Sequence, residues 1–188
     1  MKKFLLSLAF FAPALMVWSQ ENNVIKLPTD KNGKIEFTEV ADQEGIKADS
    51  LKKKAIVILN QWKNISDVKV EGNSVTANGF EDFIGGAKKQ KMKMSYGLRV
   101  DFKDNRYKIT FSKIEYTPYP DANNPTQMTT PAESWYGDYQ LLIGKGKESS
   151  SKAKIYYHIF NTTSRDIEAL KMQLIDAMGS TVPEGDDW

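Results

Sequence analysis

Alternating apolar residues between Met92 and Phe102 constrain this chain more than any other feature of its sequence. Every even-numbered position in this stretch is apolar, and every odd-numbered position is polar, charged or glycine. A helix cannot gather such a pattern on one face, whereas a strand that is buried on one side requires it. The stretch therefore predicts a long strand. The alternation resumes over residues 107–111 after Asp104-Asn105, which predicts a second strand that returns beside the first.

The two predicted strands can be registered against each other from their residue types. A two-residue turn places Phe102 opposite Tyr107, so that apolar residues meet. It also places Asp101 opposite Lys108, which pairs opposite charges. Farther along the second strand the apolar positions change from odd to even numbers. One extra residue would produce this change, so we predict a β-bulge at Ser112-Lys113.

The first twenty residues have the composition of a secretory signal peptide. Lys2-Lys3 are followed by an apolar run over residues 4–17 and by a cleavage site ending at Ser19. This run of 14 residues is shorter than the ~20 that a helix needs to span a bilayer. We therefore expect cleavage near residue 20 and an exported protein, periplasmic or secreted, with no transmembrane segment after cleavage. An uncleaved anchor is the alternative.

Charge and cysteine content limit the possible functions of the exported part. The two lysines are the only charged residues of the signal, so the mature chain holds 24 basic and 24 acidic residues. This balance argues against nucleic acid as a partner, because nucleic-acid binding relies on a basic surface. The chain has no cysteine, which excludes disulfide bonds, a thiol nucleophile and thiolate metal ligands.

The first half of the mature chain predicts one helix between short strands. Alternation over residues 34–40 indicates a first strand, and apolar residues at helical spacing over 49–62 indicate an amphipathic helix. Two further strands, 68–71 and 75–83, are separated by a turn. Asn78-Gly79 lies inside the second of them and is expected to form a bulge or a break.

The second half of the chain is less regular. Residues 118–151 contain four prolines and no periodic pattern, so we expect a long inserted loop. Residues 152–160 fit either a helix or a strand, and we favour a helix. A clear helical pattern over 167–178 predicts a last helix that begins at one of the hydroxyl residues 163–164. The tail at 182–188 is acidic and is expected to be flexible.

Consecutive strands joined by short turns predict an antiparallel sheet with one apolar and one polar face. Both predicted helices would then pack on the apolar face. We therefore expect a single α+β domain over residues 21–181, with about five strands and two helices on one face, in the order β-α-β-β-β-β-α.

Several short strings within residues 27–117 resemble a family of exported Bacteroidota proteins known as domain of unknown function 4468. They are Leu27-Pro28 with Asp30 and Gly33-Lys34-Ile35, the segment Gly45–Leu51 with Ala55, the segment Val75–Gly79, and the segment Val100–Ile109. The resemblance implies a TBP-like fold with a curved antiparallel sheet. The family has no established activity, so the resemblance implies no site residues, and a TBP-like fold by itself implies no DNA binding.

Two positions depart from the family pattern. Lys47 stands at the helix start, where the family usually has a small hydroxyl residue. Asn105 stands at the hairpin corner, where the family usually has glycine. Both departures are expected to weaken local capping or turn geometry without changing the order of elements.

Catalytic groups are sparse in the sequence. His158 is the only histidine and lies in an aromatic run, where a structural role is expected. We predict no catalytic residues, no metal site and no cofactor. A small carboxylate-dependent hydrolase is the alternative to a binding protein. It would require two of four carboxylates to converge in a cleft: Glu81, Asp101, Glu133 and Asp138.

Two groups of residues are candidate contacts for a ligand or partner. Trp135, Tyr136 and Tyr139 follow the proline-rich segment, where aromatic side chains either serve recognition or pack a loop onto the sheet. Arg99 and Lys108 lie on the polar face of the predicted hairpin. The leading hypothesis is a non-catalytic binding or interaction module of the cell envelope, with an unknown protein or a small apolar ligand as partner. A structural subunit of an envelope assembly is a further alternative.

Overall fold

The computed structural model describes residues 24–85, 90–120 and 127–179. Its elements follow in the order β1 (Phe37–Asp42), α1 (Ala48–Gln61), β2 (Ile65–Glu71), β3 (Ser74–Gly85), β4 (Gln90–Lys103), β5 (Arg106–Pro118), β6 (Thr130–Pro131), α2 (Ala132–Gly144) and α3 (Ser151–Gly179). The sheet is antiparallel with the strand order β1-β5-β4-β3-β2, and the short β6 pairs with β5. The predicted signal peptide and the predicted tail lie outside the described residues.

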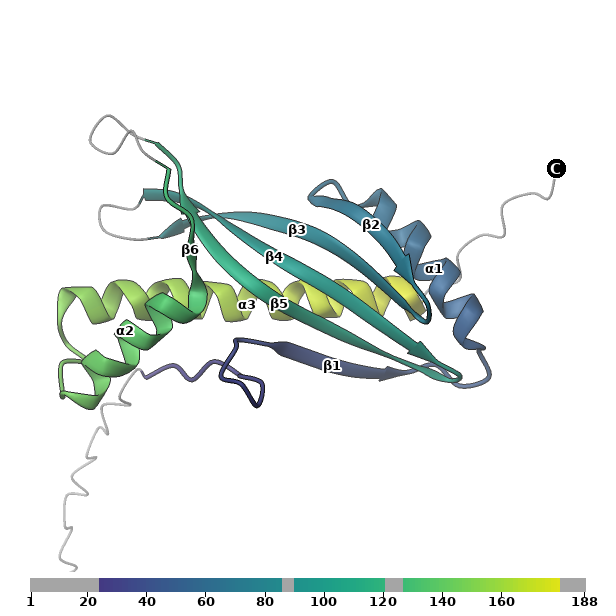
Figure 1. The fold of residues 1–188 in the computed structure, drawn as a ribbon, viewed down its shortest axis with the longest axis horizontal. Coiled ribbons are helices and arrows are strands. Elements are labelled where there is room, and N and C mark those ends of the chain that lie inside the picture. Colours follow the sequence, from purple (N-terminus) through teal and green to yellow (C-terminus); the bar gives the residue numbers. More distant parts are fainter. Residues whose placement is uncertain (1–23, 86–89, 121–126, 180–188) are drawn as a thin grey trace, which may run out of the picture.

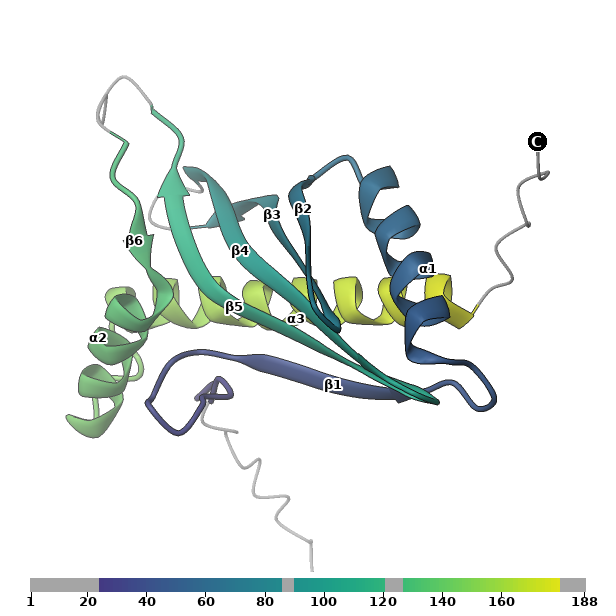
Figure 2. The ribbon, with the colours of Figure 1, turned by 45° about the vertical axis from the view of Figure 1, so that its right-hand side comes forward.

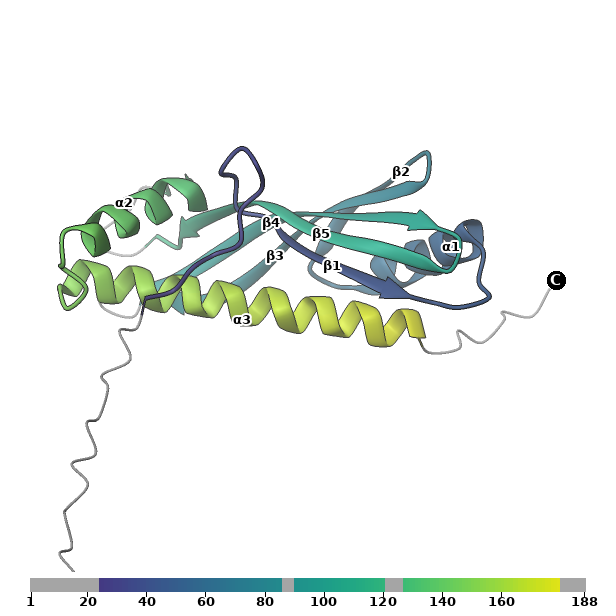
Figure 3. The ribbon, with the colours of Figure 1, turned by 90° about the horizontal axis from the view of Figure 1, so that it is seen from below.

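Helices α1 and α3 pack on one face of the sheet. In Figure 1 the strands lie in front of both helices, and Figure 3 shows α3 running beneath the length of the sheet. Helix α2 lies at the end of the sheet where β6 joins β5 (Figure 2). One apolar core joins the inner face of the sheet to all three helices. The predicted α+β architecture is confirmed, with three helices rather than two.

The β4–β5 hairpin has the predicted register. Phe102 pairs with Tyr107, and Asp101 pairs with Lys108. The predicted bulge is also present, because the pairing shifts by one residue beside Lys113, whose φ is 52°. The extra residue moves the inward-facing positions of β5 from odd to even numbers and keeps its apolar side chains in the core.

Gly79 does not interrupt β3, contrary to the expected bulge or break. The pairing of β3 with β4 continues without a shift along the whole strand. Gly79 lies opposite Tyr96, and a Cβ atom at residue 79 would come within 2.3 Å of the Tyr96 ring. The glycine therefore provides the space that the aromatic ring fills. The irregularity lies in the neighbouring strand β2, next to Asp67, whose φ is 54°.

A helix occupies part of the segment 118–151, where a long loop was expected. Helix α2 begins after Pro131, whose extended backbone (φ −58°, ψ 140°) suits the residue before a helix. Ala132, Tyr136 and Tyr139 then lie at helical spacing and contact the core. The prediction of a loop over the whole segment is wrong, because aromatic residues, followed by Leu142 and Ile143, pack this helix against the core.

Helix α3 is continuous from Ser151 to Gly179. The preference for a helix over residues 152–160 is confirmed, and Gly179 ends the helix. A helix start at residues 163–164 is wrong, because Thr163 lies buried in the middle of α3 and its hydroxyl lies 2.7 Å from the Tyr116 hydroxyl. The Thr163 hydroxyl, which suggested a helix cap, therefore forms a hydrogen bond with the buried hydroxyl of Tyr116 in the sheet.

Asn105 holds the hairpin turn in the left-handed conformation that favours glycine, with φ of 66°. Its side-chain Oδ1 accepts a hydrogen bond from the Gly45 backbone N–H at 2.8 Å. Its backbone N–H donates to the Ile46 carbonyl at 2.8 Å, and its carbonyl accepts from the Gln43 N–H at 2.6 Å. The expected weakening of the turn is therefore offset by a side chain that glycine would lack.

Candidate functional site

The side chains of the outer face form rows that cross the sheet. We use the term outer face for the sheet surface opposite α1 and α3. One row crosses five strands and consists of Val40, Lys108, Asp101, Ser74 and Glu71. The next row toward the β4–β5 turn consists of Asp42, Arg106 and Lys103. The antiparallel register thus brings residues from distant parts of the chain into one polar surface.

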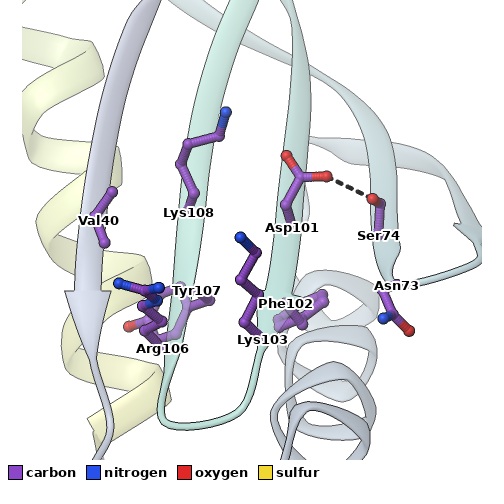
Figure 4. A pocket seen from close by; sticks show the side chains of 9 residues that line it. All are labelled: Val40, Asn73, Ser74, Asp101, Phe102, Lys103, Arg106, Tyr107 and Lys108. Atoms are coloured by element: carbon purple, nitrogen blue, oxygen red, sulfur yellow. Dashed lines mark hydrogen bonds between the residues drawn. The ribbon is translucent and has the colours of Figure 1, made fainter.

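A hollow of about 600 Å³ lies where these two rows meet (Figure 4). It is lined by Val40, Asn73, Ser74, Asp101, Phe102, Lys103, Arg106, Tyr107 and Lys108. We call it the cationic hollow, because three of these residues are cations. Within the described residues, no carboxylate forms an ion pair with Lys103, Arg106 or Lys108. The hollow therefore gathers three cations that form no ion pair within the described residues, with Asp101 as the carboxylate in its lining.

Asp101 lines the cationic hollow, and its carboxylate already accepts hydrogen bonds from neighbouring side chains. Its Oδ1 accepts hydrogen bonds from the Arg99 Nε at 2.8 Å and from the Ser74 hydroxyl at 2.5 Å. Burial acts to raise the pKa of Asp101, but the hydrogen bonds from Arg99 and Ser74 outweigh it and hold the pKa below its usual range. Arg99 also lies 3.7 Å from Glu71. Of the two predicted cationic contacts, Arg99 is ion-paired, whereas Lys108 forms no ion pair within the described residues and acts on Asp101 only by its charge.

Two smaller hollows continue the outer face toward the bulge, with volumes of about 390 and 350 Å³. Their linings share Asn78, Gly97 and Lys113. Both mix the two signs of charge: the first includes Asp67, Lys69 and Glu71, and the second includes Lys93 and Glu115. Carboxylates are therefore interleaved with cations along this part of the surface.

The three predicted aromatic contacts lie at α2, away from Arg99 and Lys108. Tyr139 is buried, and Trp135 and Tyr136 are partly buried against the core. The Trp135 ring stacks on Tyr116 of β5, with ring centroids 5.1 Å apart. These contacts agree with the interpretation that the aromatic residues pack the segment onto the sheet.

Helix α2 also holds the chain segment that precedes β1. The Tyr139 hydroxyl accepts a hydrogen bond from the Ile25 backbone N–H at 3.1 Å, and the Tyr136 hydroxyl accepts one from the Leu27 N–H at 2.9 Å. Glu133 of the same helix accepts one from the backbone N–H of residue 35 at 3.1 Å. No pattern in the sequence indicated these contacts, because each joins residues about a hundred positions apart.

The four carboxylates proposed for a hydrolase have separate surroundings. Glu81 lies on the inner side of β3, where burial raises its pKa, and Asp101 lies on the outer face. Glu133 binds the segment before β1. Asp138 accepts hydrogen bonds from Lys152 and Tyr156. The arrangement therefore does not bring two of them together for acid–base catalysis.

His158 and clusters of metal-ligating side chains would be further sources of chemistry. The ring Nε2 of His158 lies 3.1 Å from the Ile84 carbonyl, which fits the structural role expected of it. No group of three or more histidine, aspartate or glutamate side chains there could hold a metal ion. No helix in the described ranges is long and apolar enough to cross a membrane.

Lys103 and Arg106 are site residues that the sequence reasoning did not single out. Both lie in the strands whose alternation was recognised, at positions directed to the polar side. The predicted pairing of β4 with β5, continued toward the turn, pairs Lys103 with Arg106 next to the Asp101–Lys108 pair on the same face. What the register could not indicate is that the surface is hollowed there.

Comparison with known proteins confirms the fold and the family resemblance. Residues 43–117 match the family described as "Domain of unknown function (DUF4468) with TBP-like fold". A TBP-like protein from Parabacteroides distasonis ATCC 8503 has a similar structure, with a TM-score of 0.52 and 19% identity over 86% of this chain and 100% of that chain. A DUF4468 family protein from Bacteroides ovatus ATCC 8483 also has a similar structure, with a TM-score of 0.52 and 16% identity; the match covers 85% of this chain and 94% of that chain. No curated protein matches this chain.

Proposed function

We propose that this TBP-like domain is a non-catalytic binding module of the cell envelope and that a protein partner docks on its outer face. One observation carries the proposal: the cationic hollow gathers Lys103, Arg106 and Lys108, which form no ion pair among the described residues, against one carboxylate in its lining, Asp101. Such an arrangement favours a partner that brings negative charge, because complementary charge speeds encounter and fixes the docking register.

The space between the sheet and the helices is a poorer candidate for the binding site. The inner face of β4 and β5 presents buried apolar side chains, among them Met94, Val100, Ile109 and Phe111. They belong to the same core cluster as α1 and α3. A small apolar ligand would have to displace this core, whereas the outer face is already hollowed.

The pattern of charge on the outer face favours an acidic protein segment over nucleic acid. Glu71, Asp101 and Glu115 are interleaved with the cations. A continuous phosphate backbone would meet these carboxylates as well as the lysines, and nucleic-acid affinity depends on neutralising many phosphates. An acidic protein segment can place a few carboxylates in the cationic hollow and its own cations elsewhere.

The cellular setting of the proposal comes from the sequence. The predicted signal peptide supports export, and the absence of cysteine suits a domain that is stabilised by packing alone. The alternative of a structural subunit draws less support. The large exposed apolar residues are spread over several elements, for example Val57 on α1, Leu141 on α2 and Met172 on α3.

A titration followed by nuclear magnetic resonance tests the proposal. The probe is a short peptide of alternating glutamate and aspartate, and the matched peptide of glutamine and asparagine is its control. We expect saturable shifts of the Lys103, Arg106 and Lys108 amides with the acidic peptide only. Shifts confined to α1 or α3, or equal shifts with both peptides, would contradict the proposal.

Two triple variants show whether the charges of the cationic hollow cause the binding. The first variant combines Lys103→Gln, Arg106→Gln and Lys108→Gln. It should abolish the saturable amide shifts that the acidic peptide causes. The control changes three exposed lysines at the α2–α3 end of the molecule: Lys145→Gln, Lys147→Gln and Lys154→Gln. This control has the same change in net charge, so equal losses in the two variants would indicate nonspecific attraction and contradict the proposed site.

A further inference from the structure

We infer that the acidic segment of the partner adds to the free edge of β1 as an extended strand and directs carboxylates into the cationic hollow. The inference rests on the proposed function of that hollow and states how the partner is held there. β1 is the terminal strand of the sheet, and among the described residues it pairs only with β5. Figure 3 views the molecule from the β1 side, and no other described segment crosses in front of this strand. One edge of β1 therefore has no partner in the described fold.

The backbone of β1 directs alternate hydrogen-bonding groups to this free edge. The Gln43 N–H donates to the Asn105 carbonyl at 2.6 Å, just beyond the pair Asp42–Arg106. Bonding alternates along an antiparallel ladder, so Glu39 and Ala41 direct their backbone groups to β5, as Gln43 does. Thr38 and Val40 then direct theirs away from β5, and both residues are exposed. Their N–H and C=O groups are the ones that an added strand would bond.

The two edges of the sheet differ in how well they accept a further strand. At the β2 edge the pairing shifts beside Asp67, whose φ is 54°, and Lys69 follows. A bulge and a lysine both hinder strand addition. β1 has neither of these, and its register with β5 has no shift. Its inward-facing charge, on Glu39, is bound by Lys171 of α3 at 3.3 Å. β1 is therefore the edge that suits strand addition.

The cationic hollow reaches this edge of the sheet. Val40 lines its β1 side and pairs with Lys108 of β5 (Figure 4). Neighbouring strands lie about 4.8 Å apart, so an added strand would lie roughly 10 Å from β5. A glutamate opposite Val40 and the long Lys108 side chain can meet across this distance over the small valine. The next row already holds a carboxylate, Asp42, so the acidic residue belongs opposite Val40.

The two faces of β1 set the sequence pattern of the added strand. Successive side chains of a strand point to opposite faces. Acidic residues at every second position would thus lie on the outer face beside the cations. The residues between them would lie on the helix side, next to Ala41, which is partly buried against the core. The structure therefore favours a partner segment in which acidic and apolar residues alternate.

A second copy of this chain is a poorer occupant of the edge. β1 carries two carboxylates, on Glu39 and Asp42, and no cation. Pairing of two β1 strands would also place two cationic hollows side by side, because Val40 lines each of them. Like charges that are brought together disfavour such a complex. An acidic segment of another protein avoids both conflicts.

Hydrogen exchange at β1 measures strand addition on the unchanged protein. The probe is a short peptide of alternating glutamate and valine with both ends blocked. We expect the Thr38 and Val40 amides to exchange at least about tenfold more slowly at saturating peptide. The Glu39 and Ala41 amides already bond to β5 and should change less. Protection of Thr38 and Val40 without peptide that grows with protein concentration would assign the edge to a second copy and overturn the inference.

N-methylation of the probe tests the backbone contacts themselves. One derivative is methylated at the glutamate amides and the other at the valine amides, so the two have the same charge and the same number of methyl groups. In an added strand only one of these sets faces β1. We therefore expect one derivative to bind at least about tenfold more weakly and the other to bind like the unmethylated peptide. Equal affinities of the two derivatives would overturn the inference.

The same titrations separate this inference from the proposed function. Saturable shifts of the Lys103, Arg106 and Lys108 amides with unchanged exchange at Thr38 and Val40 would overturn strand addition and leave docking at the hollow standing. Absence of such shifts with both this probe and the glutamate–aspartate peptide would refute the proposed function. Shifts of the hollow together with slower exchange at Thr38 and Val40 are the result that we expect.

Discussion

The Oδ1 of Asp104 accepts a hydrogen bond from the backbone N–H of Ala48 at 2.9 Å, across 56 positions of sequence. Asp104 belongs to the β4–β5 turn, and Ala48 is the first residue of α1. The residue before the helix, Lys47, makes no side-chain cap. The turn of the sheet therefore supplies the acceptor that a serine, threonine or aspartate normally supplies from the adjacent position. The departure at Lys47 is compensated by this contact from the hairpin.

The contact predicts that Asp104→Ala lowers the free energy of unfolding by about 0.5–2 kcal/mol, the usual cost of losing a cap. Adding Lys47→Ser should restore part of the loss, because serine can cap the helix locally. Urea unfolding of the single and double variants measures both effects. An unchanged midpoint for Asp104→Ala would show that the 2.9 Å contact does not stabilise the helix.

Gly79 should tolerate no side chain while Tyr96 is present. The 2.3 Å approach of a Cβ to the ring predicts that Gly79→Ala costs about 1–3 kcal/mol of unfolding free energy. Gly97→Ala is the control in the adjacent strand, because its Cβ would be 3.5 Å from the nearest atom, and it should cost less than about 0.5 kcal/mol. In a double-mutant cycle, Tyr96→Leu should reduce the cost at residue 79. Additive losses would argue against the clash.

Glu81 should make stability fall as pH rises. Burial is the largest cause that raises its pKa in the folded state, and nearby Asp166 adds to it. The folded protein therefore holds this proton more tightly than the unfolded chain, so the contribution is present below the unfolded value of about 4.3 and is lost as pH rises through the folded pKa. Glu81→Gln should raise the unfolding free energy at pH 7 and have little effect at pH 3.5. Chemical unfolding at both pH values measures this difference.

Asp82 is the control for this pH dependence, because its pKa is shifted in the opposite direction. The hydrogen bond with Lys91 is the largest cause, and it lowers the pKa of Asp82. Its stabilising contribution is present above the unfolded value and is lost as pH falls through the folded pKa. Asp82→Asn should therefore be destabilising at pH 7 and not at low pH. The same sign of effect for both variants would contradict the assignment.

The segment before β1 should loosen when the hydroxyl groups of α2 are removed. Tyr136→Phe deletes the acceptor for the Leu27 N–H and should cost about 0.5–1.5 kcal/mol. Faster hydrogen exchange at Leu27, with unchanged exchange in β4, would locate the effect. Tyr157→Phe on α3 serves as a control and should leave Leu27 unchanged. An effect on the whole sheet would instead indicate that α2 is needed for the fold.

Local periodicity predicted the hairpin because its two strands are adjacent in sequence. The register of Phe102 with Tyr107 and the bulge at Lys113 follow from alternation alone. Helix α2 was missed because prolines precede it and because its core-facing residues before Leu142 are aromatic or small rather than aliphatic. The space above Gly79 was missed for another reason: the Tyr96 ring that fills it belongs to a different strand.

The candidate site could be predicted only in part. Lys108 and Asp101 were placed on the polar face by alternation, and the structure adds Lys103 and Arg106 to them. The pairing of Arg99 with Asp101 could not be inferred, because it depends on side-chain conformation within one strand. Residue types give the face on which a side chain lies, but the three-dimensional fold decides which charges neutralise one another.

Photo-crosslinking in cells that produce the protein tests the central claim most directly. A photoreactive amino acid replaces Val40 at the cationic hollow or, as a control, Val57 on α1; both side chains are exposed, by 55% and 44%. We predict a crosslink to one acidic protein partner from residue 40 and none from residue 57. The crosslink should disappear when Lys103, Arg106 and Lys108 are all changed to glutamine. A partner captured equally from both positions, or one that survives the triple change, would contradict docking at the cationic hollow.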